Sequence, residues 1–295
     1  MSTPLLYLNG AIVEEDEARI SPFDRGFLWG DGVYEITPCF DGKLFRLEDH
    51  LDRLYRSLRY VRIDPGLSLD EMAAKTRELL TANSNRLLPG GAYRVGHWVT
   101  RGVNTDGFGA GDAQAPTVMM FFRPIEVEAI ARDQRDGIVL TVPATRRTPP
   151  EAIEARAKVT SKMNQILAEL DANAHGAKSL MLDLNGNVAE NSSANFFMVR
   201  DGVLTTPPER NILEGITRKV VFELADKLDI PLAERDFTMY DVAQAEEYFL
   251  TSSAICAMPV RQIDSFTPKL GIPGPVTQRL IDAFAEDTGY RFGGA

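Results

Sequence analysis

The chain of 295 residues contains only two cysteines and three histidines. Cys39 and Cys256 lie too far apart in the sequence for a disulfide framework or for a zinc site built from several cysteines. With three histidines in all, a histidine-rich metal centre is also not expected. We therefore predict that the protein binds no metal ion.

Long apolar segments are absent as well. The longest uncharged apolar stretch, residues 118–122, is far shorter than the roughly 20 residues of a membrane-spanning helix. Residues 14–17 are all acidic, whereas a signal peptide has a basic start and an apolar run. From these absences we expect a cytoplasmic protein that has no membrane partner.

Basic residues are in the minority: 32 lysines and arginines stand against 42 acidic residues, a net charge of −10. This charge disfavours nucleic acid as a partner and leaves open local basic pockets for small anions. Hydrophobic residues make up 44% and charged residues 25% of the chain, enough for a sizeable core. The length fits one or two domains.

Turn signals and apolar spacing divide the first part of the chain. Asn9-Gly10 and Asp41-Gly42 predict two hairpins. Leucines with helical spacing predict a helix over residues 47–60. The remaining predicted elements are a helix over 68–82, strands over 92–101 and 117–122, and a glycine-rich loop over 102–111.

Pro124 interrupts the last of these strands, and the apolar pattern loosens after it. We place the inter-domain connection here, at residues 124–134. A small N-terminal domain, residues 1–123, would precede the connection, and a larger C-terminal domain, residues 135–295, would follow it.

The second part mixes the same two patterns. A helix is predicted over 161–174, where Met163, Ile166, Leu167 and Leu170 share one face. Further predicted elements are strands over 138–142, 179–183, 195–199, 203–205 and 247–250 and helices over 216–228 and 276–286. The whole chain therefore predicts an α/β fold with two unequal domains.

Common catalytic signatures are missing: there is no Walker A loop, no G-x-S-x-G elbow and no H-E-x-x-H pair. Lys158 and Lys162 stand at a strand-to-helix junction instead. A lysine amine can form a Schiff base if burial or a nearby cation lowers its pKa. By residue type alone, a solvated helix start explains both lysines equally well.

Two more segments could line a polar site. Residues 188–197 combine Glu190 with several small hydrogen-bonding residues, a composition that an ordinary loop shares. In residues 213–218, Gly215 and Thr217 precede a helix whose first N–H groups could bind a phosphate. A plain helix N-cap is the alternative.

Taken together, these segments resemble the class IV, or fold-type IV, pyridoxal phosphate-dependent aminotransferases over nearly the full length. This family includes branched-chain aminotransferases, D-amino acid aminotransferases and (R)-amine transaminases, with aminodeoxychorismate lyase as a relative. The matching segments are Asp24-Arg25-Gly26, Gly30-Asp31-Gly32-Val33-Tyr34-Glu35, His50-Leu51-Asp52-Arg53-Leu54, Lys158, Glu190, Asn195-Phe196-Phe197, Asp201-Gly202, Gly215-Ile216-Thr217-Arg218, Thr251-Ser252-Ser253 and Pro259-Val260.

The resemblance implies a two-domain α/β enzyme whose larger domain has a β-barrel-like core. It also implies that pyridoxal 5'-phosphate is the cofactor and that Lys158 binds it covalently and moves the substrate proton. We prefer Lys158 to Lys162 because Lys158 has the family's spacing to Leu167-Ala168. Lys162 would also lie roughly 90° from the apolar face of its predicted helix.

Other cofactor contacts are implied in the same way. Glu190 matches the carboxylate that keeps the pyridine nitrogen protonated, so that the ring can accept electrons. Leu213 would pack against the ring. The implied phosphate-binding residues are Arg53, Ile216, Thr217, Ser252 and Ser253. The phosphate-binding role of Arg53 rests on the resemblance alone. Its side chain would point about 140° from the leucine stripe of its own helix, where a solvated arginine also fits.

Substrate residues are less defined. Tyr34 matches the Gly-Val-Tyr-Glu segment of D-amino acid aminotransferases, and we add Ile36, His97 and Arg101 as pocket candidates. Arg101 would bind a carboxylate or lie on the surface, and His97 would line the pocket or the core. The chain lacks both the Arg-x-His carboxylate trap of the D-amino acid enzymes and the tyrosine that branched-chain enzymes have after the lysine.

We therefore expect a ping-pong aminotransferase that moves an amino group from a hydrophobic or branched-chain amino acid to a 2-oxo acid. A D-amino acid or (R)-amine transaminase is the alternative, and a lyase resembling aminodeoxychorismate lyase is third. The resemblance also implies a homodimer or higher homo-oligomer, in which loop 102–111 would complete the partner's pocket.

Overall fold

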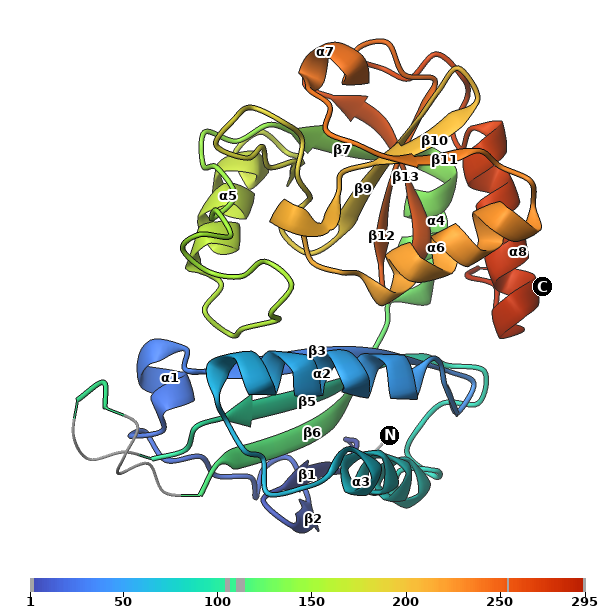
Figure 1. The fold of residues 1–295 in the computed structure, drawn as a ribbon. Helices are drawn as coiled ribbons and strands as arrows, with labels where there is room; N and C mark the ends of the chain where they lie inside the picture. Colours follow the sequence, from blue (N-terminus) through green and yellow to red (C-terminus); the bar gives the residue numbers. More distant parts are fainter. Residues whose placement is uncertain (1–2, 104–106, 110–114, 254, 294–295) are drawn as a thin grey trace. The chain divides into compact units, whose positions relative to one another are not determined.

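The computed structural model describes residues 3–103, 107–109, 115–253 and 255–293. Its chain divides into two compact units (Figure 1). The N-terminal unit comprises Met1–Ile125 and Ala157–Lys162, and the C-terminal unit comprises Glu126–Arg156 and Met163–Ala295. Each unit contains one β-sheet with helices, so the predicted mixed α/β fold is confirmed.

An antiparallel sheet of six strands, in the order β2-β1-β6-β5-β3-β4, forms the base of the N-terminal unit. Both predicted hairpins are present, and Asn9, Gly10, Asp41 and Gly42 all have the positive φ that such turns require. The strands are β1 (Leu6–Leu8), β2 (Ala11–Val13), β3 (Gly32–Phe40), β4 (Lys43–Leu44), β5 (Ala92–Thr100) and β6 (Thr117–Pro124). The helices are α1 (Arg25–Trp29), α2 (Leu47–Val61) and α3 (Leu69–Ala82).

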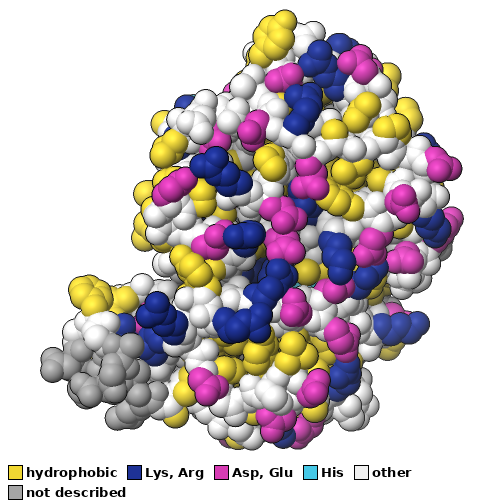
Figure 2. Space-filling model, viewed as in Figure 1, with side chains coloured by type: hydrophobic (Ala, Val, Ile, Leu, Met, Phe, Trp, Pro, Cys, Tyr) yellow, Lys and Arg dark blue, Asp and Glu magenta, His cyan; other side chains and the backbone are white. Residues whose placement is uncertain are grey.

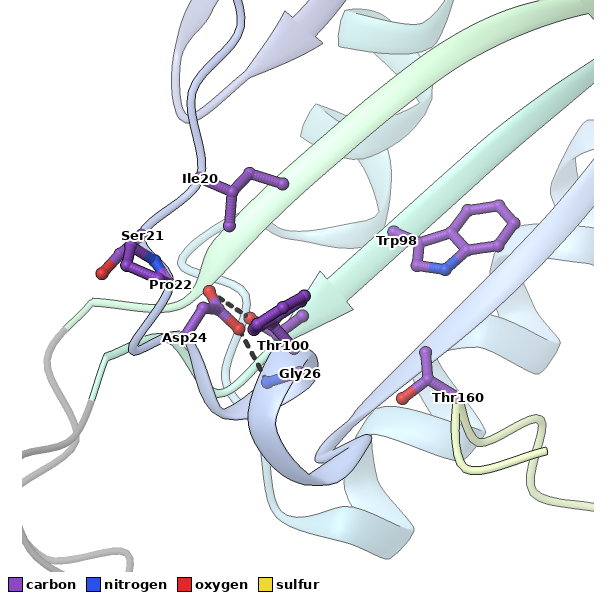
Figure 3. A pocket seen from close by; sticks show the side chains of 9 residues that line it. Ile20, Ser21, Pro22, Asp24, Gly26, Trp98, Thr100 and Thr160 are labelled. Carbon is purple, nitrogen blue, oxygen red and sulfur yellow. Dashed lines mark hydrogen bonds between the residues drawn. The ribbon is translucent and has the colours of Figure 1, made fainter. Parts of the chain in front are cut away.

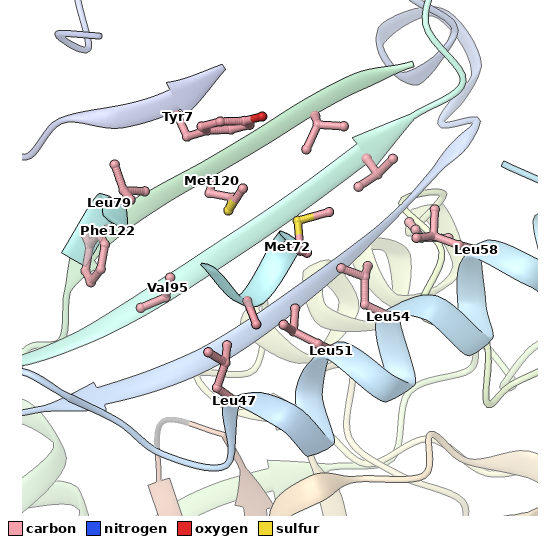
Figure 4. Close-up of a cluster of buried hydrophobic side chains, with 14 of the residues drawn as sticks. Tyr7, Leu47, Leu51, Leu54, Leu58, Met72, Leu79, Val95, Met120 and Phe122 are labelled. Atoms are coloured by element: carbon pink, nitrogen blue, oxygen red, sulfur yellow. The ribbon is translucent and has the colours of Figure 1, made fainter. Parts of the chain in front are cut away.

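The core of this unit lies between the sheet and helices α2 and α3 (Figure 4). The predicted leucine stripe of α2 is buried there, against Val95, Met120 and Phe122 of the sheet. Helix α3 begins with a capping box, in which Ser68 and Glu71 each bind the other's backbone N–H. The opposite face of the sheet carries Tyr34, Trp98 and other half-buried side chains.

A seven-stranded sheet, in the order β11-β10-β9-β12-β13-β7-β8, forms the C-terminal unit. Strands β9 and β12 at its centre are almost wholly buried, and the rings of Phe197 and Phe249 stack between them. The strands are β7 (Ile138–Thr141), β8 (Lys178–Ser179), β9 (Asn195–Arg200), β10 (Val203–Thr206), β11 (Leu232–Glu234), β12 (Glu247–Ser252) and β13 (Ile255–Ile263). The helices are α4 (Val127–Asp136), α5 (Met163–Asn173), α6 (Ile216–Lys227), α7 (Met239–Val242) and α8 (Pro275–Thr288), with a 3₁₀ turn η1 (Glu209–Asn211).

The structure differs from the prediction in several places, and the short elements α1, β11 and α7 were not predicted. Most of the expected connection 124–134 forms helix α4, which packs against β13, a strand that was not predicted. The expected strand 179–183 is reduced to the two-residue β8. Helix α5 begins at Met163 rather than at residue 161, because residues 157–162 belong to the N-terminal unit, where residues 158–160 pair with β3.

Charged side chains of both signs are mixed across the face drawn in Figure 2. Among the described helices, none has both the length and the apolar composition of a membrane span.

His97 on β5 gives the stability of the fold a pH dependence. Burial lowers the pKa of His97 from 6.5 to about 4, a shift that the charge of Glu35 opposes and that of His50 assists. The unfolded chain therefore binds a proton that the folded chain does not, and stability is lost as the pH falls below 6.5. We expect wild type to lose about 2 kcal/mol more than His97→Gln between pH 7.5 and pH 5.

Denaturant unfolding of both proteins at the two pH values measures this difference. His97→Gln is a suitable reference because glutamine does not titrate and can still form a hydrogen bond with Thr76 Oγ1, which lies 2.9 Å from His97 Nε2. Equal losses in the two proteins would contradict the assignment.

Candidate active site

Lys158 lies on a segment that extends the N-terminal sheet along the edge of β3. Val159 forms a bridge with Val33, and the Tyr34 N–H donates to the Lys158 carbonyl over 3.0 Å. On the other side, the Lys158 N–H donates to Ser57 Oγ of α2 over 3.1 Å. The backbone of this lysine is therefore held from two directions.

Both candidate lysines approach one aromatic ring. Lys158 Nζ is 4.7 Å and Lys162 Nζ is 5.4 Å from the centroid of the Tyr34 ring. The helical-wheel argument against Lys162 was wrong, because α5 begins only at Met163. Preference for Lys158 now rests on the family spacing alone.

The face of the sheet beside these lysines is aromatic. Tyr34 contacts Trp98 with ring centroids 4.8 Å apart, and Trp98 contacts Phe121 at 5.1 Å. Gly96 makes room for the last ring, since a Cβ atom at this position would lie 2.5 Å from Phe121. The result is a continuous apolar surface that begins at the lysine pair.

A cavity of about 540 Å³ opens next to Trp98 (Figure 3). Thr160 from the lysine segment and Asp24 from the turn before α1 both line it. The buried Asp24 carboxylate is already satisfied by the hydroxyls of Thr100 and Thr117 and by the Gly26 N–H. The rest of the lining is Ile20, Ser21, Pro22, Gly26, Phe27 and Thr100.

Arg53 is buried rather than solvated. It is 2% exposed, and its guanidinium donates through Nε and Nη2 to the two oxygens of Glu35 over 2.8 and 2.7 Å. His50 Nδ1 lies 3.1 Å from the same carboxylate. Burial alone would raise the pKa of Glu35, but the charge of Arg53 and the hydrogen bond and charge of His50 hold it well below its ordinary value.

Of the predicted pocket residues, Tyr34 and Ile36 are half-buried on β3, and Tyr34 is the one that meets the lysines. Arg101 donates to Asp31 through Nε and Nη2 and to the carbonyls of Val61 and Arg62, so it serves here as a structural link. His97 lies in the core under α3, on the face of the sheet opposite the Tyr34 ring.

The expected loop 102–111 is only partly described, and residues 104–106 and 110–111 lie outside the described part of the chain. Arg25 of α1 donates to the carbonyls of Gly107, Phe108 and Gly109. The Phe108 ring packs on Trp29 at 5.1 Å and is 82% exposed. This part of the loop is therefore fixed to α1.

Glu190 is the centre of the polar cluster in the C-terminal unit. Arg147 Nε donates to Oε1 over 2.9 Å, while Asn195 Nδ2 and the Leu213 N–H donate to Oε2 over 3.1 and 3.0 Å. Glu190 and Arg147 are both buried. An anion with this support can accept a hydrogen bond from a heterocyclic N–H.

The start of α6 lies beside this cluster. Gly215 caps the helix without a side-chain hydrogen bond, and a Cβ atom there would lie 2.0 Å from Asn195 Oδ1. Ile216 and Thr217 are the first helical residues, and both are buried. Asn195 is also the strand partner of Thr251, whose buried Oγ1 has no hydrogen-bond partner among the described residues.

These features fit a phosphate group. A helix N-terminus with uncapped N–H groups and an unpartnered hydroxyl both favour an anion. Ser252 at the end of β12 and Ser253 after it are half-buried next to Thr251. In the described part of the chain, no group of three or more His, Cys, Asp or Glu residues could hold a metal ion.

Comparison with known proteins identifies the family. A family model described as Amino-transferase class IV matches residues 32–263. A Methanocaldococcus jannaschii protein named "Putative branched-chain-amino-acid aminotransferase" is 36% identical over 283 residues, 95% of each chain. The D-alanine aminotransferase of Staphylococcus haemolyticus is 32% identical over 286 residues, 95% of this chain and 96% of that protein.

Solved structures give the same result. The branched-chain aminotransferase of the thermophilic archaeon Thermoproteus uzoniensis, solved with norvaline, superposes with a TM-score of 0.86 at 29% identity and covers 97% of this chain and 94% of that one. The Escherichia coli branched-chain amino acid aminotransferase gives 0.85 at 28% identity, with 96% and 93% covered. A further structure of a branched-chain enzyme that matches this chain holds pyridoxamine 5'-phosphate.

The two-sheet fold matches that of solved branched-chain aminotransferases, so the protein has the fold of an amino-group transferase. The chain belongs to the class IV aminotransferases. Enzymes of this class use pyridoxal 5'-phosphate, so the predicted cofactor and enzyme class are confirmed.

Sequence reasoning missed several residues of the site. Arg147 lies in a loop without a periodic pattern, so its contact with Glu190 could not be predicted. Ser57 of α2 was also missed. His50, Arg53 and Ser57 have helical spacing and form a buried polar stripe on α2 beside the leucine stripe, a pattern that could have been noticed.

The ion pair of Arg147 and Glu190 gives a stability prediction. Arg147→Met removes the cation and leaves Glu190 buried, which should lower the free energy of unfolding by about 3 kcal/mol. Arg200→Met is the control, because Arg200 pairs with Asp241 at the surface and should contribute less than about 1 kcal/mol. Equal losses of unfolding free energy in the two variants, measured by denaturant unfolding, would contradict the prediction that Arg147→Met is the more destabilising change.

Proposed function

We propose that this aminotransferase moves amino groups between hydrophobic or branched-chain amino acids and 2-oxo acids by a ping-pong mechanism. The observation that carries the substrate class is the apolar face of Tyr34, Trp98 and Phe121 next to the lysine pair. A small apolar side chain would bury most of its surface there, a gain of roughly 25 cal/mol per Å². The relatives named as branched-chain enzymes add support.

Residue roles in this proposal come from the family resemblance, and the contacts within each unit are compatible with them. When bound, pyridoxal phosphate withdraws electrons from the Cα of the substrate. Lys158 holds the cofactor and moves the proton at Cα. Glu190, supported by Arg147 and Asn195, holds the proton on the pyridine nitrogen. Leu213 would pack on the ring, and Arg53, Ile216, Thr217, Ser252 and Ser253 would bind the phosphate.

A D-amino acid or (R)-amine transaminase is the second candidate. Relatives named D-alanine aminotransferase and the Tyr34-Glu35 pair favour it. A lyase resembling aminodeoxychorismate lyase is third, and it would act without a 2-oxo acid acceptor.

We also propose that the enzyme is a cytoplasmic homodimer or larger homo-oligomer. Exposed apolar side chains in both units support self-association, among them Phe27 and Phe108 near α1 and Met163 and Leu170 on α5. Light scattering of the full chain measures its mass and so tests the oligomeric state. A monomer at micromolar concentration would contradict the proposed homo-oligomer.

The lysine assignment has a direct spectroscopic test. Lys158→Ala should abolish the visible absorption band of the bound cofactor, because the covalent link is lost. Lys162→Ala is the matched control and should keep the band. The reverse pattern would transfer the role to Lys162.

The donor class is tested by adding L-leucine, D-alanine and (R)-1-phenylethylamine to separate samples of the holoenzyme. We expect L-leucine to bleach the visible band and the other two to leave it. Bleaching by D-alanine or by the amine alone would select the second candidate. Pyruvate released from an amino donor without any added 2-oxo acid would select the lyase.

A further inference from the structure

The buried carboxylate of Glu35 has no role in the chemistry described above. It is fully buried in the N-terminal unit, and it accepts from the Ile36 N–H as well as from Arg53, with His50 in contact. Removing two charges from water costs free energy that their mutual attraction often does not recover, so a buried charged pair calls for an explanation. Arg53, its partner, is the residue to which we assign the cofactor phosphate, so this inference rests on that part of the proposed function.

When the phosphate leaves, a buried phosphate-binding arginine loses the negative charge that balanced its own. A buried guanidinium without a counter-charge costs several kcal/mol, and the unfolded chain does not bear that cost. In a surface site water would compensate, but Arg53 is 2% exposed. A permanent carboxylate on two of its nitrogens removes the difficulty.

We propose that Glu35 is the built-in counter-ion of Arg53, a positioning residue that keeps the arginine oriented and charge-balanced when no phosphate is bound. The bidentate contact over 2.8 and 2.7 Å fixes the plane of the guanidinium. It also means that the phosphate meets an arginine whose charge is already balanced. Cofactor affinity is thereby moderated, while the cofactor-free chain stays folded.

Glu35→Gln has two opposing effects on anion binding. Glutamine can keep only one of the two bonds to Arg53, because its amide nitrogen would face an N–H donor, and this loosens the guanidinium. It also removes a negative charge close to the anion. At an effective dielectric constant of about 20, one unit charge a few ångströms away is equivalent to at least about tenfold in affinity. We expect the charge to dominate, so the variant should bind phosphate more tightly.

The experiment is a thermal melt of the full chain, freed of cofactor, in a phosphate titration. Compared with wild type, Glu35→Gln should melt at least about 5 °C lower without phosphate. Its midpoint should then rise more steeply with inorganic phosphate, at an apparent dissociation constant at least about tenfold lower. A purely structural role would lower the midpoint without changing the phosphate response.

Glu247→Gln is the matched control. Glu247 is equally a buried acid, but its partners are uncharged: the N–H groups of Val276 and Thr277 and the Thr277 hydroxyl at the start of α8. This variant should melt lower and keep the wild-type phosphate response. The double variant Glu35→Gln/Arg53→Met should recover most of the midpoint and lose the response.

An unchanged or weaker phosphate response in Glu35→Gln would overturn the inference. If Arg53→Met alone keeps the wild-type response, the assignment of the phosphate to Arg53 fails instead, and the inference fails with it. The two failures are therefore told apart by a measurement that does not depend on turnover.

Discussion

The pairing of residues 158–160 with the edge of β3 is the constraint on which the site depends. A lysine at the end of a loop would be mobile and solvated, and its amine would point in no fixed direction. Here the carbonyl of Lys158 is bound by β3 and its N–H by Ser57 of α2. The side chain starts from a fixed backbone and reaches the ring of Tyr34, so the aromatic face and the Lys158 amine are placed together by main-chain hydrogen bonds.

In both units, a buried carboxylate is paired with a buried arginine. Glu35 with Arg53, and Glu190 with Arg147, are ion pairs in which further donors satisfy the remaining carboxylate oxygens. Such pairs contribute little net stability compared with apolar residues of similar size, but they are costly to break. They fix the orientation of groups that a cofactor would contact, and orientation is what a catalytic site needs.

Local patterns in the sequence predicted most of the fold. The leucine spacing of α2 and the Asn-Gly and Asp-Gly turns depend on neighbours along the chain, so they could be read directly. Helix α4 was missed because only Ile130 of it is buried, which leaves almost no apolar period to detect. The burial of Arg53 and its contact with Glu35 arise from tertiary packing of a second, polar stripe, and the position of Arg147 depends on a loop. Family resemblance supplied the roles of Lys158 and Glu190, which the residues alone left open.

The path of the chain between the units has a consequence for folding. It passes from one unit to the other three times, after residues 125, 156 and 162, because the lysine segment returns to the first sheet. A fragment that ends at residue 125 would lack the strand that borders β3 and would expose that edge to foreign strands. The two units are therefore expected to unfold cooperatively rather than as independent modules, and the segment that carries Lys158 joins the first sheet only after more than half of the chain has been synthesised.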